Sequence, residues 1–212
     1  MSGLAKHFEK IRQVFQPKRK FRLEEDKIPV DGHGRPDLSR YSKPLAHYIS
    51  LYEASMTRIP AAELSSERAN FAFRQRVHAT WGLRAKGAEA IPYLLTLVNR
   101  KNPDAREDAS FLLGELKRSE GIADVLLAQL KNEEELVAQS VMIQALGKLR
   151  YRPAVPALAR LILLDDIDRD IQLDAVDSLG RIMKIDFSES GEPLVAAISW
   201  LATQGYSREE HK

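Results

Sequence analysis

The sequence predicts an all-α protein: a right-handed α-solenoid of about four helical hairpins. The prediction starts from four glycines that lie inside helical patterns at spacings of 32, 33 and 33 residues: Gly82, Gly114, Gly147 and Gly180. Apolar residues recur at the same offsets around each glycine, and a second apolar helix pattern follows each one. Self-similarity with a period of this length is typical of proteins built from stacked repeats.

Each glycine marks the first helix of a hairpin. Positions −9, −5, −1 and +2 from the glycine form one stripe of an α-helix, which we expect to be buried. The four copies of this stripe are Phe73, Val77, Trp81 and Arg84; Ala105, Ala109, Leu113 and Leu116; Ala138, Met142, Leu146 and Leu149; and Ile171, Ala175, Leu179 and Ile182. Trp81 is accordingly interpreted as a core residue. Because glycine inside a helix costs about 1 kcal/mol relative to alanine, its recurrence predicts a close contact between helices there.

A second stripe, at offsets 0, 3, 4 and 7, predicts the second helix of each hairpin. Its copies are Ile91, Leu94, Leu95 and Val98; Ile122, Val125, Leu126 and Gln129; Val155, Leu158, Ala159 and Ile162; and Leu194, Ala197, Ile198 and Leu201. Pro92, Pro156 and Pro193 fall in its first turn, where proline is tolerated. In the fourth hairpin this stripe starts 14 residues after the glycine instead of 8 or 9. The extra residues predict an acidic loop over 186–192.

Four regions follow from these patterns. Residues 1–22 read as a basic amphipathic arm, and residues 23–62 as an irregular connector followed by a capping helix over 44–58. The repeats occupy residues 63–204, and residues 205–212 form a polar tail. The apolar face of the arm consists of Leu4, Phe8, Ile11 and Phe15.

Two stretches of the repeats, 104–116 and 145–158, resemble HEAT-like repeats of the phycobilisome-lyase type, and the resemblance extends over residues of about 66–204. It implies an α-solenoid, in a family that ranges from scaffolds to bilin lyases and, more distantly, DNA glycosylases. That family commonly has arginine eight residues before the glycine. Arg74 and Arg106 fit this pattern, whereas Gln139 and Gln172 depart from it, so any arginine ladder stops halfway. A tetratricopeptide array is the alternative fold, but its closing proline is missing.

The composition argues against several kinds of chemistry. The chain has no cysteine, which excludes disulfides and thiolate sites. Its five histidines lie in five different segments without ligand spacing, so we expect no metal and no cofactor. The aspartates of residues 165–170 are interpreted as helix caps. With no apolar run of about 18 residues and no signal peptide, the sequence predicts a cytoplasmic protein.

Charge is distributed unevenly along the sequence. Residues 1–106 carry 20 Lys and Arg against 11 Asp and Glu, whereas residues 107–212 carry 12 against 19. A polarised molecule of this kind suits an oriented encounter with charged partners.

Stacking should leave one face of the second helices uncovered, and we name it the partner ridge. Its positions are Tyr93, Thr96, Asp124, Leu127, Ala157, Arg160, Ala196 and Ser199, with Trp200 beside them. The partner ridge lacks the ladder of cations that a DNA-binding groove needs. We therefore expect a non-catalytic scaffold or adaptor, a subunit of a larger assembly, that binds protein through this ridge and the arm.

Two alternatives from other classes stay open. The first is a nucleic-acid-binding protein that uses the basic arm and the arginines of the first repeat helix, which are Arg68, Arg74 and Arg76. The second, implied by the family resemblance, is a lyase or chaperone that acts on a chromophore-bearing protein.

Overall fold

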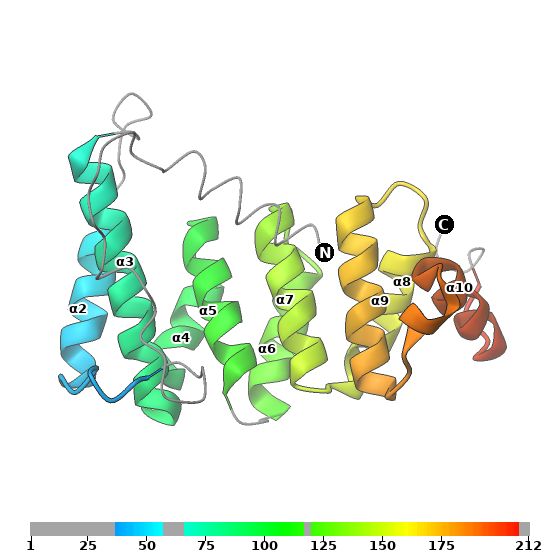
Figure 1. The fold of residues 1–212 in the computed structure, drawn as a ribbon, viewed down its shortest axis with the longest axis horizontal. Helices are drawn as coiled ribbons and strands as arrows, with labels where there is room; N and C mark the ends of the chain where they lie inside the picture. Colours follow the sequence, from blue (N-terminus) through cyan, green and yellow to red (C-terminus); the bar gives the residue numbers. More distant parts are fainter. Residues whose placement is uncertain (1–36, 57–65, 117–119, 208–212) are drawn as a thin grey trace. The chain divides into compact units, whose positions relative to one another are not determined.

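The computed structural model describes residues 37–56, 66–116 and 120–207, and within these ranges the regular structure is entirely helical (Figure 1). The α-helices are α2 (Leu45–Ser55), α3 (Glu67–Lys86), α4 (Ile91–Val98), α5 (Pro103–Glu115), α6 (Glu120–Leu130), α7 (Leu136–Lys148), α8 (Val155–Leu163), α9 (Arg169–Met183) and α10 (Pro193–Thr203). Short 3-10 turns are η2 (Gly87–Ala90), η3 (Arg152–Ala154) and η4 (Phe187–Ser190). The prediction of an all-α fold is confirmed, and no helix in these ranges is long and apolar enough to cross a bilayer.

The chain divides into two compact units, residues 1–93 and residues 94–212. In the first unit α2 packs against α3, and the helix predicted over 44–58 is confirmed for residues Leu45–Ser55. Tyr48 and Tyr52 form the buried side of α2. Gly82 of α3 packs against the Tyr48 ring. The contact is so close that a Cβ added at Gly82 would lie 2.0 Å from Tyr48 Cδ1.

The apolar stripe of α3 is not buried as predicted. Phe73 is 45% exposed and Val77 is 38% exposed, while Trp81 is half-buried with the Arg84 guanidinium 4.9 Å from its ring centre. The assignment of Trp81 to the core was therefore wrong. The physical reason is rotational: at 3.6 residues per turn, Gly82 and the stripe lie on largely opposite sides of the helix. Packing the glycine side against α2 leaves the stripe exposed.

In the second unit α5, α7 and α9 pack side by side in one row (Figure 1). Their stripes are buried as predicted, apart from the half-buried Leu116 at the end of α5. Helix α6 packs against α7 and helix α8 packs against α9, while α10 packs on α8, α9 and η4. Two layers of helices therefore share one apolar core.

The glycines of this row make the close contacts that their recurrence predicts. A Cβ at Gly114 would lie 2.9 Å from Ala145 Cα, and one at Gly147 would lie 2.8 Å from Ser178 Cα. Ala145 and Ser178 each stand two residues before the next glycine, so the same contact is made twice along the row. Gly180 differs, because a Cβ there would lie 2.6 Å from the backbone oxygen of Ile185 in its own following segment.

Candidate functional site

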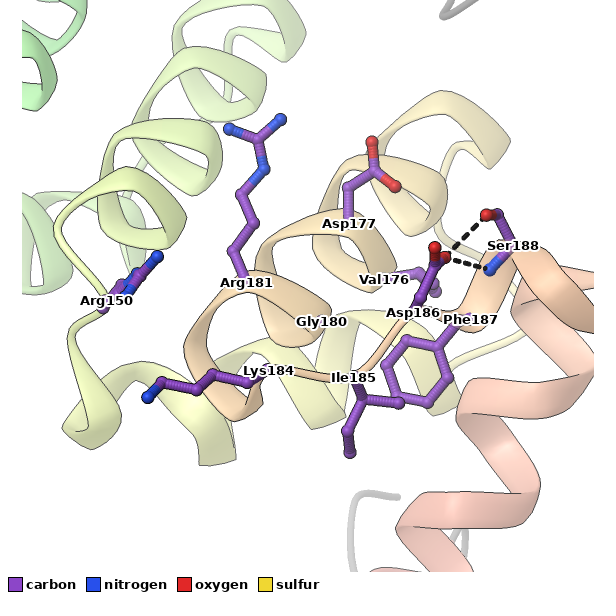
Figure 2. A pocket seen from close by; sticks show the side chains of 10 residues that line it. All are labelled: Arg150, Val176, Asp177, Gly180, Arg181, Lys184, Ile185, Asp186, Phe187 and Ser188. Atoms are coloured by element: carbon purple, nitrogen blue, oxygen red, sulfur yellow. Dashed lines mark hydrogen bonds between the residues drawn. The ribbon is translucent and has the colours of Figure 1, made fainter.

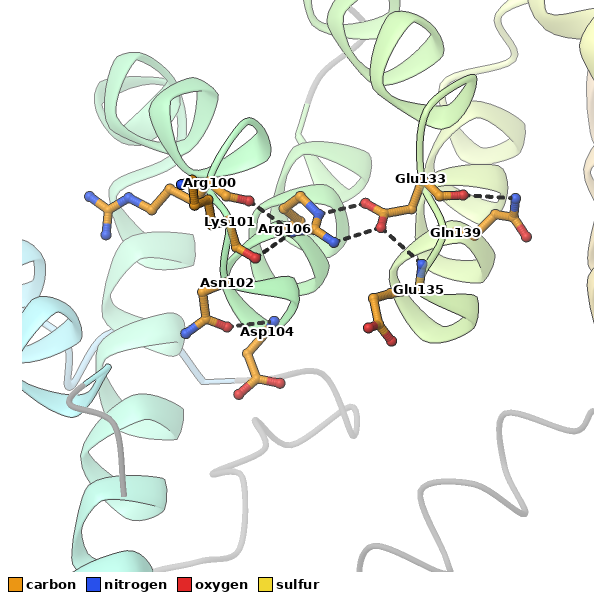
Figure 3. Close-up of polar contacts among 8 residues, drawn as sticks. All are labelled: Arg100, Lys101, Asn102, Asp104, Arg106, Glu133, Glu135 and Gln139. Carbon is orange, nitrogen blue, oxygen red and sulfur yellow. Dashed lines mark hydrogen bonds and ion pairs between the residues drawn. The ribbon is translucent and has the colours of Figure 1, made fainter. Parts of the chain in front are cut away.

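A polar cluster in the row is centred on Arg106, in the first half of α5 (Figure 3). Its Nε and Nη2 donate to the two carboxylate oxygens of Glu133, both at 2.6 Å. Its Nη1 donates to the backbone oxygens of Arg100 at 2.8 Å and Lys101 at 2.9 Å. One guanidinium thus ties the loop before α5 to the loop before α7.

Glu133 is the buried partner of this pair. Its side chain is 1% exposed, and one of its carboxylate oxygens also accepts the backbone N–H of Glu135 at 3.1 Å. Burial opposes ionisation, but the hydrogen bonds and charge of Arg106 outweigh it, so the pKa of Glu133 lies below its ordinary value. The low pKa favours the charged carboxylate, which Arg106 neutralises in this buried position.

Glutamines in the same column make related contacts, although the sequence suggested that an arginine ladder stops there. Gln172 Nε2 donates to the backbone oxygen of Leu164 at 2.8 Å, and Gln139 Nε2 donates to that of Glu133 at 3.3 Å. Each side chain reaches the loop that precedes its own helix. In α7 and α9 the glutamine eight residues before the glycine therefore binds loop carbonyls, as Arg106 does in α5.

A second polar group lies between α7 and α9. Ser140 Oγ donates to Asp174 Oδ2 at 2.5 Å, and Gln144 Nε2 donates to Oδ1 at 3.0 Å. Burial raises the pKa of Asp174; these hydrogen bonds oppose the rise, and the charges of Asp177 and Asp170 add to it. Unlike Glu133, Asp174 has no cationic partner in either of these two bonds.

Most of the predicted partner ridge is exposed or half-buried. Thr96, Asp124, Arg160 and Ser199 are exposed, and Leu127, Ala157, Ala196 and Trp200 are half-buried. Asp124 accepts a hydrogen bond from the Tyr151 hydroxyl, and the Trp200 ring lies edge-on to buried Phe187 at 6.1 Å between centroids. Trp200 therefore covers the core at this end of the row while keeping part of its surface free.

Tyr93 departs from the expectation of an uncovered ridge residue. Its hydroxyl donates to Glu53 Oε1 at 2.7 Å, and its ring meets Tyr52 edge-on at 6.2 Å. Tyr93 is thus half-buried against α2, which covers the side chain that the repeat pattern left open. The arm residues Leu4, Phe8, Ile11 and Phe15 lie outside the described residues.

Of the aspartates of residues 165–170, Asp168 is confirmed as the N-cap of α9, and Asp170 lies in the first turn of that helix. Asp168 accepts hydrogen bonds from the backbone N–H groups of Asp170 at 2.9 Å and Ile171 at 3.3 Å, at the start of α9. Across the described ranges no three His, Cys, Asp or Glu side chains come together as a metal site would require.

The polar links of Glu133 and Asp174 were missed in the sequence. Glu133 stands in a run of three glutamates, which reads as a solvated loop, and Asp174 lies in a helix with two other aspartates, Asp170 and Asp177. For Glu133 the available signal was its partner Arg106, a polar residue eight residues before Gly114; the sequence offered no such signal for Asp174.

Comparison of the sequence with protein-family models, with curated proteins and with solved structures found no match.

Proposed function

We propose that the protein is a non-catalytic cytoplasmic scaffold or adaptor, built as an α-solenoid of HEAT-like hairpins and incorporated in a larger assembly by protein contacts. The observation that carries the proposal is the repeated contact of Gly114 with Ala145 and of Gly147 with Ser178. Stacked repeats are stabilised by such equivalent contacts between neighbours, and they present long surfaces to partners. The resemblance to phycobilisome-lyase-type repeats supports the same assignment.

The proposed contact surface is the partner ridge on α4, α6, α8 and α10, together with the arm. Leu127 and Trp200 supply half-buried apolar surface, with exposed Arg160 and Asp124 as charged neighbours. Interfaces commonly combine a few apolar anchors with a polar rim. Tyr93 contributes less than the sequence suggested, because its hydroxyl is bonded to Glu53.

The test is cross-linking and mass spectrometry on the tagged full-length protein in its source cells. The double variant Leu127→Asp with Arg160→Glu should lose its cross-linked partner while keeping its melting temperature. Arg152→Glu, which changes an exposed arginine outside the ridge, is the matched control and should retain the partner. If the ridge variant is folded and still cross-links to the same partner, the ridge is not the contact surface.

The arm is tested separately by deleting residues 1–22. We expect the truncated protein to keep its melting temperature and to leave the assembly, because a short amphipathic segment is stable as a helix only when its apolar face is covered. Unfolding of the truncated protein would show instead that the arm packs on its own protein. Visible absorbance in a co-purified partner would support the chromophore-related alternative.

Nucleic acid is a second candidate because α3 combines exposed aromatic and arginine side chains. Phe71 is 57% exposed and Phe73 is 45% exposed, and Arg68 and Arg74 are exposed on the same helix. Single-stranded nucleic acids bind by stacking on aromatics and by phosphate contacts with cations. The measurement is the anisotropy of a labelled single-stranded RNA over a salt series: affinity that falls steeply with salt and with Phe73→Ala supports this function.

A further inference from the structure

A cleft of about 430 Å³ lies between the end of α7, the last turns of α9 and the segment that follows α9 (Figure 2). Buried Val176 and Phe187 and half-buried Ile185 supply its apolar lining. The segment after α9 is the insertion that lengthens the fourth hairpin, so this cleft belongs to the least regular part of the repeat array.

Three cationic side chains line the cleft, and they come from different segments. Arg150 follows α7, Arg181 lies in the last turn of α9, and Lys184 follows α9. All three are exposed, and none makes an ion pair or a side-chain hydrogen bond within the part of the protein that the structure describes. The nearby Asp186 is already engaged, because its Oδ1 accepts from Ser188 N at 2.9 Å and from Ser188 Oγ at 2.6 Å.

Two residues that line the cleft have an unusual backbone conformation. Arg150, with φ 51°, and Lys184, with φ 63°, are the non-glycine residues of positive φ within the described ranges, and both line it. The left-handed position after a helix is usually glycine, because a Cβ is strained there. The other residues of positive φ in those ranges are indeed Gly87, Gly191 and Gly205.

Stabilisation of the helix dipole does not account for this choice. A cation in the last turn of α7 or α9 would interact with the negative end of the helix equally well, and Lys148 and Arg181 already occupy those turns. The strained positions of Arg150 and Lys184 instead place their side chains at the cleft. Strain that persists in a fold is often retained for binding.

We propose that this cleft binds one carboxylate of a protein partner, with an adjoining apolar side chain packed on Ile185 and Phe187. Three cations and the two carboxylates of Asp177 and Asp186 leave an excess of one positive charge, which suits a single anionic group better than a polyanionic phosphate backbone. Guanidinium groups bind carboxylates in a paired geometry. The inference rests on the proposed function in one respect, since the ligand is part of a protein.

A carboxylate of this kind comes from an acidic side chain or from the C-terminus of a polypeptide, and NMR titration of the full-length protein separates the two sources. The probes are acetyl-Leu-Glu-Leu-amide, acetyl-Leu-Leu with a free C-terminus and the neutral acetyl-Leu-Gln-Leu-amide. At least one acidic peptide should shift the backbone amides of Lys184 and Ser188 saturably, with a Kd on the order of 1 mM. The proposal is overturned if the neutral peptide shifts them equally, if no peptide does, or if a single-stranded oligonucleotide binds there more tightly.

The strained residues give a variant test with two opposite readouts. Lys184→Gly and Arg150→Gly should each raise the melting temperature by about 2–4 °C, because glycine relieves the strain of the left-handed backbone conformation. Each variant should also bind the acidic peptide about fivefold more weakly, or weaker still, because it lacks one of the cations. Arg181→Gln should weaken binding without the rise in melting temperature. Arg169→Gln, an exposed arginine of α9 outside the cleft, is the matched control. Unchanged peptide affinity in the three cleft variants would refute the site.

The peptide titration and the cross-linking experiment fail independently. If acidic peptides bind but no partner is cross-linked in cells, the scaffold function is refuted and the cleft stands. If a partner is cross-linked but the peptides do not bind, the cleft alone is refuted.

Discussion

Helix α3 and the three helices of the row carry the same glycine-centred pattern, but they use it differently. In α5 and α7 the glycine faces the following first helix, through Ala145 and Ser178, and the apolar stripe is largely buried. In α3 the glycine faces the preceding helix α2, through Tyr48, and Phe73 and Val77 are exposed. The pattern therefore marks a helix that contacts a neighbour closely, without specifying which neighbour.

Side-chain size explains part of this difference. Position −9 holds Phe73 in α3 but alanine in α5 and α7, and position −5 holds Val77 where α5 and α9 have alanine. Small residues allow helices to approach closely, whereas large ones fill the space between them. The opposite side of α3, with Ala79 and Gly82, is the narrow side, and there the Tyr48 ring fits.

The strongest test of the comparison is the column eight residues before the glycine. Arg106→Gln should cost about 3–5 kcal/mol, since it leaves the buried Glu133 carboxylate without its cation. Arg74→Gln, in the same column of α3, is the matched control and should change the free energy of unfolding by less than about 0.5 kcal/mol, because Arg74 is exposed. Denaturant unfolding measures both. The pair Arg106→Gln with Glu133→Gln should recover part of the loss; failure to recover it would contradict the assignment of a buried ion pair.

The glycine contact comes next in size. Gly147→Leu should cost on the order of 2–3 kcal/mol, because its Cβ would lie 2.8 Å from the backbone of Ser178 and has no room to relax. Gly121→Ala in α6, where nothing lies within 4 Å of a new Cβ, is the matched control and should leave the protein unchanged or slightly more stable. A melting temperature of Gly147→Leu close to that of the original protein would show that the row does not depend on this contact.

A smaller and pH-dependent effect is expected at Asp174. Because the pKa of Asp174 is raised in the fold, its contribution to stability is complete below its ordinary value of 3.8 and is lost as the pH rises through the raised value. Asp174→Asn should therefore be as stable as the original protein or more stable at pH 7, by less than about 1 kcal/mol. Unfolding at pH 7 and at pH 3 measures the difference. An advantage of the asparagine variant that persists at pH 3 would contradict this account.

The carboxyl of Glu133 should affect the pH dependence of stability in the opposite direction to Asp174. Its pKa is lowered, so its stabilisation is present above its ordinary value of 4.5 and is lost as the pH falls through the lowered value. Acid should accordingly weaken the link between Arg106 and Glu133 while it relieves the cost of the charged Asp174.

The smallest effect is expected on the exposed stripe of α3. Val77→Ser should change the free energy of unfolding by less than about 0.5 kcal/mol, whereas Met142→Ser, at the same position in α7, should cost about 2–5 kcal/mol because Met142 is fully buried. Thermal unfolding of the two variants compares the two helices directly. Equal destabilisation would mean that the α3 stripe is covered in solution.

Sequence periodicity was sufficient to predict the helices of the row and their buried sides. The recurrence of apolar residues at helical spacing predicts which side of a helix is buried, and Ala138, Met142 and Leu146 are buried accordingly. The same reasoning failed for Phe73 and Trp81, because periodicity contains no information about whether a neighbouring element is present to cover that side.

The contacts at the candidate site were harder to predict. The predicted stacking leaves Tyr93 uncovered, and only the three-dimensional position of Glu53, 40 residues earlier, shows that the Tyr93 hydroxyl is hydrogen-bonded. Glu133 resembles its neighbours Glu134 and Glu135 in sequence and differs from them only in burial. Long-range partners of this kind are set by packing, and local patterns do not encode them.

The way in which α9 ends has a consequence for self-association. A row of equivalent helices could in principle grow by adding the first helix of another molecule to its free end, as an open edge invites polymerisation. At Gly180 that contact is already occupied, because the Ile185 oxygen lies where a neighbouring backbone would pack and Ile185 N donates to Gly180 O at 2.9 Å. The turn after α9 therefore occupies the position at which another helix would otherwise extend the row.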